Sequence, residues 1–216
     1  METDKSAKET LTELVLEFLE AAVHEFLFAW QVYPKEAFEK RVLYDVPTHM
    51  SRHPMLCEYI HSMLHGCHTW LMRGELEKLC VILLSKEGRA IETLVIEPVW
   101  IAPLTEAAGL NKDHTLPLEQ LEESFRAGMV ALMTTAVSYE ITSIDMKPHT
   151  FRILAQTVED ATNRGTAVND DTVSNSWVLA DVYWCEDQQK QKEIIPVKSI
   201  HAETLPIRLN IYMTKQ

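Results

Sequence analysis

Glycine is scarce in this chain, at six of 216 residues. The sequence has no G-x-S-x-G segment, no glycine-rich phosphate loop and no G-x-G-x-x-G run. These absences remove the usual signatures of serine hydrolases, P-loop proteins and dinucleotide-binding enzymes. Acidic pairs such as Glu122-Glu123 and Asp170-Asp171 fit a solvated helix face and a polar loop. The sequence therefore predicts a protein that is not an enzyme and holds no cofactor.

Cysteines are few, and long apolar runs are missing. The four cysteines form no C-x-x-C pair and no framework typical of secreted proteins: Cys57, Cys67, Cys80 and Cys185. Reduced thiols in the cytosol or nucleus are expected. The charged segment METDKSAKET at residues 1–10 does not resemble a signal peptide, and charges interrupt every apolar stretch short of a membrane span. We expect a soluble intracellular protein that does not enter a membrane.

Positive charge is in deficit. The chain has 20 Lys and Arg against 32 Asp and Glu, a formal net charge of -12. A field of that sign repels phosphate backbones, so direct binding to nucleic acid is not expected. Any role in DNA metabolism would then depend on a protein partner. The length suits one domain with a substantial core.

Helical patterns dominate the first two-thirds. Ser6–Glu9 has the form of a capping box, and Pro34 ends the apolar stripe that follows it. This stripe recurs at steps of three and four residues: Leu11, Leu14, Val15, Phe18, Leu19, Ala22, Phe26, Leu27 and Trp30. We expect the rest of the fold to pack around this helix. Residues 42–46 are predicted to form a short strand stopped by Pro47, and Pro54 to open a helix that ends near Gly74.

Strand patterns dominate the last third. Residues 76–84 and 90–96 predict a hairpin, followed by a loop at 98–116 and a third helix at 117–139. Further strands are expected at 150–158, 176–184, 193–198 and 205–213, with a polar stretch at 159–176. Helices first and strands later indicate an α+β fold.

One helix face carries possible metal ligands. His53, Cys57, His61 and His65 are spaced four residues apart, followed by Cys67 and His68. A straight helix can bring about two such side chains to one tetrahedral ion, because successive ones rise by roughly 6 Å. No second element supplies the remaining ligands. We therefore expect no metal site, and a metal-dependent enzyme on the His53–His68 face stays as the less favoured alternative.

Aromatic residues offer another possibility. Tyr33 and Tyr59 lie in or after helical segments, and Trp177 and Trp184 flank a predicted strand. Packing in the core explains any one of them. Together they can line a groove for an extended peptide, because Tyr and Trp rings stack on proline and a strand edge pairs with peptide backbone.

Four segments carry a family resemblance. VYPKEAFEKRVLYDVP (32–47), HPMLCEYI (53–60), the hairpin at 81–97 and IPVKSI (195–200) resemble the HORMA-domain family. Within it, the chain is most similar to the B-type mitotic-arrest-deficient-like branch, the accessory subunits of translesion DNA polymerase zeta. The similarity covers residues 10–213, and it is strong in the first hundred residues and thinner from 98 to 176.

The resemblance implies an adaptor with three main helices on an antiparallel sheet. Residues 10–213 would form a single HORMA domain, after a flexible N-terminus at 1–9. Its parts would be a core at 10–158, a C-terminal safety belt at 159–204 and a closing strand at 205–213. The belt would enclose a proline-containing peptide from the catalytic subunit of DNA polymerase zeta. Family positions that contact this peptide match Tyr33, Tyr59 and Trp177. A nuclear location follows, with the cytoplasm as a second compartment, and roles in translesion synthesis, DNA repair and the cell cycle.

Two further surfaces are implied by the resemblance. Arg126 matches a basic residue at a HORMA–HORMA interface, which would give a homodimer or heterodimer; an exposed helical arginine is the alternative. Ile194, Arg208 and Asn210 match a surface for a deoxycytidyl-transferase translesion polymerase. The chain departs from the family pattern at Asn210, where an aromatic residue is expected. A spindle-checkpoint or meiotic HORMA protein with a different client remains the alternative function.

Overall fold

The computed structural model describes residues 2–101, 118–140, 148–158, 177, 193–201 and 206–215. The predicted strand at 176–184 apart from Trp177, most of the loop at 98–116 and much of the predicted belt at 159–204 lie outside these residues. No side chain is described for residues 2–6 and 137–140.

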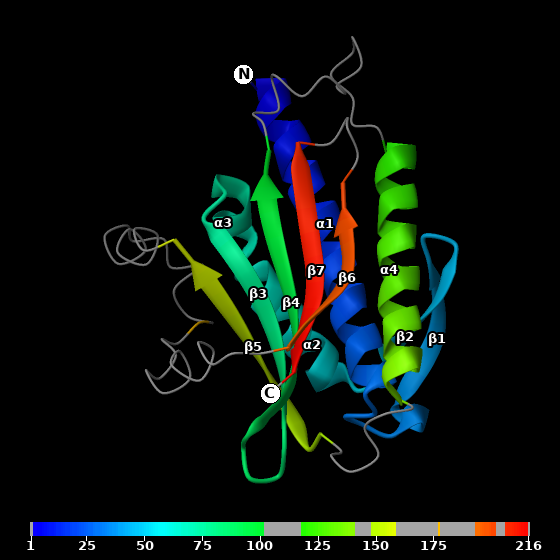
Figure 1. Cartoon of the computed structure of the whole chain (residues 1–216). Coiled ribbons are helices and arrows are strands. Elements are labelled where there is room, and N and C mark those ends of the chain that lie inside the picture. Colours follow the sequence, from blue (N-terminus) through cyan, green and yellow to red (C-terminus); the bar gives the residue numbers. More distant parts are fainter. Residues whose placement is uncertain are drawn as a thin grey trace.

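The first helix, α1, spans Glu2–Ala29 and lies behind the main sheet in Figure 1. It begins before the capping box at Ser6–Glu9, so residues 2–9 of the predicted flexible N-terminus are helical. Its predicted apolar stripe is confirmed as the centre of the core, with Leu11, Val15, Phe18, Leu19, Phe26 and Leu27 all buried. After it, the short 3-10 turn η1 at Lys35–Ala37 follows Pro34.

The prediction of one strand at residues 42–46 is wrong. The structure has a hairpin there, with β1 at Phe38–Leu43 and β2 at Val46–Ser51. Tyr44 and Asp45 form its turn, with φ angles of 51° and 57°. Two consecutive left-handed residues are typical of the tight turns that join twisted antiparallel strands. The apolar run therefore crosses a turn, and Pro47 pairs with Val42 inside the hairpin.

The predicted second helix is two helices. Helix α2 begins at Pro54, as expected, but ends at His65, and α3 spans His68–Arg73. Gly66 and Cys67 lie at the junction. Gly74 ends α3 in the left-handed conformation, with φ of 72°, which glycine adopts without strain. None of the helices in the described part of the chain is long and apolar enough to cross a bilayer.

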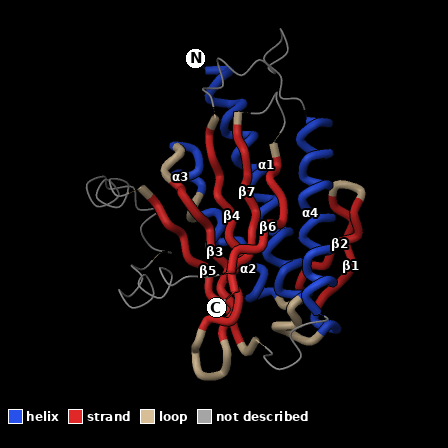
Figure 2. The backbone as a smooth tube through the Cα atoms, viewed as in Figure 1, coloured by secondary structure: helices blue, strands red, loops and turns tan. Residues whose placement is uncertain are grey.

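The main sheet has five strands in the order β5-β3-β4-β7-β6, each antiparallel to its neighbours (Figure 2). Their bounds are Leu76–Leu84 for β3, Ala90–Trp100 for β4, Thr150–Thr157 for β5, Glu193–Ile200 for β6 and Ile207–Lys215 for β7. The predicted hairpin is confirmed, although β4 extends into the expected loop. Among the described strands, β5 and β6 lie at the two edges of the sheet.

The helices cover one face of this sheet. Helix α4, at Leu118–Glu140, lies beside β6 in Figure 1, and the β1–β2 hairpin lies on its far side. Alternate residues of β7, including Ile207, Leu209, Ile211 and Met213, are buried in the core under the helices. The intervening residues of β7 therefore face away from the helices. This arrangement confirms the predicted α+β class.

Candidate partner-binding site

Tyr33 and Tyr59 meet at the edge strand β5. Both rings approach Phe151 edge-on, with ring centroids 6.4 Å and 5.9 Å away respectively. Phe151 is buried, whereas the Tyr59 side chain in α2 is 41% exposed. The three rings come from segments far apart in the sequence, and they form an aromatic cluster with one accessible side.

The two tyrosines are neutral at physiological pH. Burial raises the pKa of the Tyr33 hydroxyl and is also the largest cause of the raised pKa of Tyr59. The backbone of Ile153 opposes part of this rise in the pKa of Tyr59. The cluster therefore suits an uncharged ligand with apolar rings.

The backbone edge of β5 lies next to this cluster. Among the described strands, β5 pairs with β3 alone, through partners such as Val81 and Ile153. The other edge presents backbone donors and acceptors, which an extended peptide can pair with by adding a strand.

Trp177, the third predicted residue, lies at the junction of α2 and α3. Its ring packs near Trp70 with centroids 5.9 Å apart and against Gly66. Gly66 follows Tyr59 by seven residues and so lies on the same side of the helical segment, about 10 Å further along. An extended chain advances about 3.3 Å per residue, so about three peptide residues would span the interval from Tyr59 to Gly66, against which Trp177 packs.

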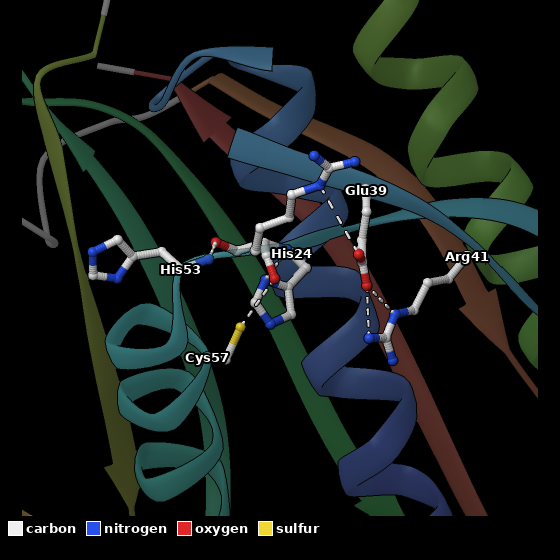
Figure 3. Close-up of polar contacts among 7 residues, drawn as sticks. His24, Glu39, Arg41, His53 and Cys57 are labelled. Carbon is white, nitrogen blue, oxygen red and sulfur yellow. Dashed lines mark hydrogen bonds and ion pairs between the residues drawn. The ribbon is translucent and has the colours of Figure 1, made fainter. Parts of the chain in front are cut away.

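A polar group around the start of α2 has the residue types of a cysteine nucleophile with its base (Figure 3). Its geometry does not activate the thiol. The Cys57 thiol donates to the Ser51 carbonyl oxygen at 3.1 Å, and burial raises the pKa of Cys57. A base should lower that pKa, as thiolates are the reactive form. The His24 imidazole is hydrogen-bonded to β2, because its Nδ1 accepts from the Ser51 N–H at 3.5 Å. This group holds α1, β2 and α2 together.

The histidine face of α2 does not converge on one point. His61 pairs with Glu20 at 3.0 Å and approaches His65, with ring centroids 4.1 Å apart. Cys67 turns into the core, where burial raises its pKa to about 12. Within the described ranges, no group of three or more His, Cys, Asp or Glu side chains can hold a metal ion. The alternative of a metal-dependent enzyme on His53–His68 thus finds no support in the geometry.

Comparison with known proteins identifies the family. The chain is 30% identical over 210 residues to the mitotic spindle assembly checkpoint protein MAD2B of Rattus norvegicus, covering 96% of this chain and 93% of that protein. The chain belongs to the MAD2B family. MAD2B of Danio rerio is likewise 30% identical, over 211 residues and the same shares of both chains. No protein-family model matches the chain.

Other MAD2B-family relatives carry a second name. The DNA polymerase zeta processivity subunit of Schizosaccharomyces pombe is 33% identical over 122 residues, covering 54% of this chain and 56% of that protein. These relatives support the coarse function of a non-catalytic adaptor that binds partners.

Solved structures confirm the HORMA fold. A chain of a mitotic checkpoint complex matches with a TM-score of 0.69 and 18% identity, covering 95% of this chain and 98% of that chain. The C. elegans protein HTP-2 bound to a HIM-3 closure motif matches with a TM-score of 0.65 and 10% identity, covering 96% and 91%. The fold class expected from the sequence is therefore shown.

Arg126, the predicted dimer residue of this MAD2B-family chain, contacts the hairpin turn of its own chain. Its guanidinium donates to the Asp45 carboxylate at 2.7 Å and to the Tyr44 carbonyl oxygen at 2.9 Å. Both side chains are exposed, so the ion pair contributes little stability. A partner could displace it easily, and the HORMA–HORMA role of Arg126 stays a prediction.

The predicted second-partner residues share the face of the sheet that points away from the helices. Arg208 and Asn210 lie on that face of β7, and Ile194 of β6 pairs with Thr214 on the same face. Ile194 is 65% exposed. Six residues separate Arg208 from Thr214, which places the ends of this surface about 20 Å apart. Its role as a binding surface stays a prediction.

Three site residues were not identified from the sequence: Phe151, Gly66 and Trp70. Phe151 occupies an alternating position of a predicted strand, and that pattern indicates burial but not a neighbour. Gly66 and Trp70 lie inside the stretch from Pro54 to Gly74 that the sequence predicts to be one continuous helix. The signal available was the glycine itself, which is disfavoured within helices and so often marks a boundary or a close approach.

The buried His24 predicts a dependence of stability on pH. Burial is the main cause that lowers its pKa from 6.5; Arg41 adds to this effect and Glu20 opposes it. The unfolded chain therefore binds a proton more readily than the folded chain, and folding stability should fall as the pH drops below 6.5. Urea unfolding at about pH 7.5 and about pH 5.5 measures this loss.

The variant His24→Gln separates this effect from the other histidines. Glutamine keeps an acceptor for the Ser51 N–H but does not titrate. We expect the loss of stability between the two pH values to be smaller in the variant than in the wild type. An equal loss in both proteins contradicts the assignment to His24.

Proposed function

We propose that this chain is an adaptor that encloses a proline-containing segment of the catalytic subunit of DNA polymerase zeta. It would link that subunit to other factors of translesion synthesis and the DNA-damage response, in the nucleus. Family membership supports the adaptor class, and the name of the S. pombe relative supports the polymerase partner. The observation that carries the proposal is the aromatic cluster of Tyr33, Tyr59 and Phe151 beside the edge of β5.

In this proposal, the peptide extends along β5 and pairs with its backbone edge. Proline rings contact the uncharged rings of Tyr59 and of Trp177, which packs against Gly66 about 10 Å along the helical segment from Tyr59. Segment 159–204 closes over the peptide as a belt. Release then requires local unfolding, so dissociation is slow relative to the contact area.

Removing both aromatic contacts tests the proposal. In Tyr59→Ala/Trp177→Ala, we expect affinity for the proline-containing peptide to fall at least about tenfold, which corresponds to about 1.4 kcal/mol. Isothermal titration with a synthetic peptide from the polymerase zeta catalytic subunit measures this change.

The matched control is Val42→Ala, because Val42 is exposed on the β1–β2 hairpin, which forms a two-stranded sheet separate from the sheet that contains β5. Its affinity should equal that of the wild type. A peptide with its prolines replaced by alanine should bind weakly to all three proteins. If the double variant binds as tightly as the wild type, the assigned site is wrong.

A checkpoint role is the second candidate, because relatives across most of the chain are named mitotic spindle assembly checkpoint proteins. The fold and site would be the same and the client different. Affinity capture from dividing cells distinguishes the two: recovery of the polymerase zeta catalytic subunit supports the first, and recovery of checkpoint components without it supports the second.

The two other surfaces belong to the same proposal. Ile194, Arg208 and Asn210 would receive the deoxycytidyl-transferase polymerase, and Arg126 would join a second HORMA domain. The shared face of β6 and β7 supports the first, and the weak exposed pairing of Arg126 supports the second.

A further inference from the structure

The backbone conformation at position 66 does not require glycine. Its φ and ψ are -61° and -21°, an ordinary right-handed helical conformation that alanine adopts more readily. Gly74 and Gly88 differ, since both have positive φ. The reason for glycine at position 66 must therefore lie in the space around it.

That space is filled by the Trp177 indole. A Cβ atom placed on Gly66 would overlap with Trp177 Nε1 and lie 3.0 Å from its Cδ1. The ring atoms of an indole cannot bend away individually, so an alanine at 66 and Trp177 in its present position exclude each other. On another side, the Trp70 ring approaches at an interplanar angle of 56°.

Packing contacts, and not a hydrogen bond, hold the Trp177 ring in this position. Its Nε1 is buried and has no hydrogen-bond partner in the described structure. Within the described residues, packing against the core, with Gly66 and Trp70 among its contacts, is therefore what orients it. Because the Trp177 ring is oriented by close packing, adding one methyl group at position 66 should displace it.

We propose that Gly66 and Trp70 form a preformed seat for Trp177 and so position it for peptide capture. Gly66 is then a positioning residue, which acts on the peptide only through Trp177. The effect on peptide capture rests on the proposed function. The seat, which is the packing of Trp177 on Gly66 and Trp70, exists in the chain without peptide.

Two measurements on Gly66→Ala test the seat and its consequence separately. The first is the exciton signal of the Trp70–Trp177 pair in circular dichroism, isolated by a double-mutant cycle with Trp70→Phe, Trp177→Phe and both changes together. Signals of single rings and of other ring pairs cancel in this cycle. We expect the signal in the wild type and its loss in Gly66→Ala. A signal that persists in Gly66→Ala overturns the inference.

The second measurement is the dissociation rate of a fluorescent form of the proline-containing peptide. We expect Gly66→Ala to accelerate dissociation about five- to tenfold, since affinity differences of this kind arise mainly in the dissociation rate. Ser62→Ala, an exposed position one turn earlier in α2, should leave the rate unchanged. In a Trp177→Ala background, Gly66→Ala should have no further effect.

The outcomes separate the two ideas. If Gly66→Ala accelerates dissociation equally with and without Trp177, it acts by another route and the positioning role is wrong. Loss of the exciton signal with unchanged dissociation also overturns the positioning role. If the wild type does not bind the peptide, the proposed function fails while the exciton signal still decides whether the seat exists.

Discussion

The variant Phe18→Ala is expected to lower the free energy of unfolding by about 3–5 kcal/mol, the usual range for removing a buried phenylalanine. Phe18 is 0% exposed on α1. Its ring stacks on Phe125 of α4 with centroids 4.6 Å apart, and it approaches Tyr44 at the hairpin turn. Gly128 of α4 lies beside this ring, and a Cβ there would overlap with Ile200 Cδ1 of β6 and lie 3.2 Å from Phe18 Cζ. One side chain therefore joins three elements.

Denaturant unfolding of the purified protein measures the loss. Phe18→Leu keeps much of the apolar volume and should lose less stability than Phe18→Ala. Val130→Ala serves as a control on α4, because Val130 is 47% exposed and should change stability little. A loss below about 1 kcal/mol in Phe18→Ala would show that the core relaxes around the cavity and that α1 is not its centre.

The sequence predicted α1 and the β3–β4 hairpin because their patterns are long and regular. It failed at residues 42–46, where the decisive feature was a turn. Tyr44 and Asp45 carry positive φ, and no glycine marks the position. Tyr44 is held there by its packing on Phe125, with ring centroids 5.3 Å apart, and by the bond from Arg126 to its carbonyl oxygen. These contacts come from α4, some eighty residues away, so a local pattern could not reveal them.

The sequence predicted some residues of the candidate site but not the contacts between them. Tyr33, Tyr59 and Trp177 were named through a family resemblance, and the structure brings the first two together. Their partner Phe151 lies on β5, more than ninety residues from Tyr59, so no local pattern predicts this contact. The seat of Trp177 depends on a helix break that the apolar periodicity of residues 54–74 conceals, since the stripe continues through it.

The variant Glu25→Ala should lower the free energy of unfolding by about 1–3 kcal/mol, because it leaves buried hydrogen-bond donors without their acceptor. Glu25 is 3% exposed, and its carboxyl group accepts the backbone N–H of His49 at 2.8 Å and lies 3.2 Å from His49 Nδ1. The His49 ring stacks on Phe28 with centroids 3.5 Å apart. His49 and Ser51 alternate along β2, and both of their N–H groups point away from β1 to side chains of α1. Helix α1 thus caps the free edge of the hairpin.

Truncation to alanine leaves the His49 N–H and imidazole without this partner, and unsatisfied buried donors are more destabilising than a lost surface contact. Glu25→Gln retains a carbonyl oxygen that can accept from the His49 N–H, so its loss should be clearly smaller. Urea unfolding measures both variants, and amide hydrogen exchange of β1 and β2 locates the effect. Exchange should accelerate in the hairpin more than in β3 and β4 in Glu25→Ala. Equal destabilisation by alanine and glutamine would instead indicate that charge, and not acceptance of the edge N–H, anchors the hairpin to α1.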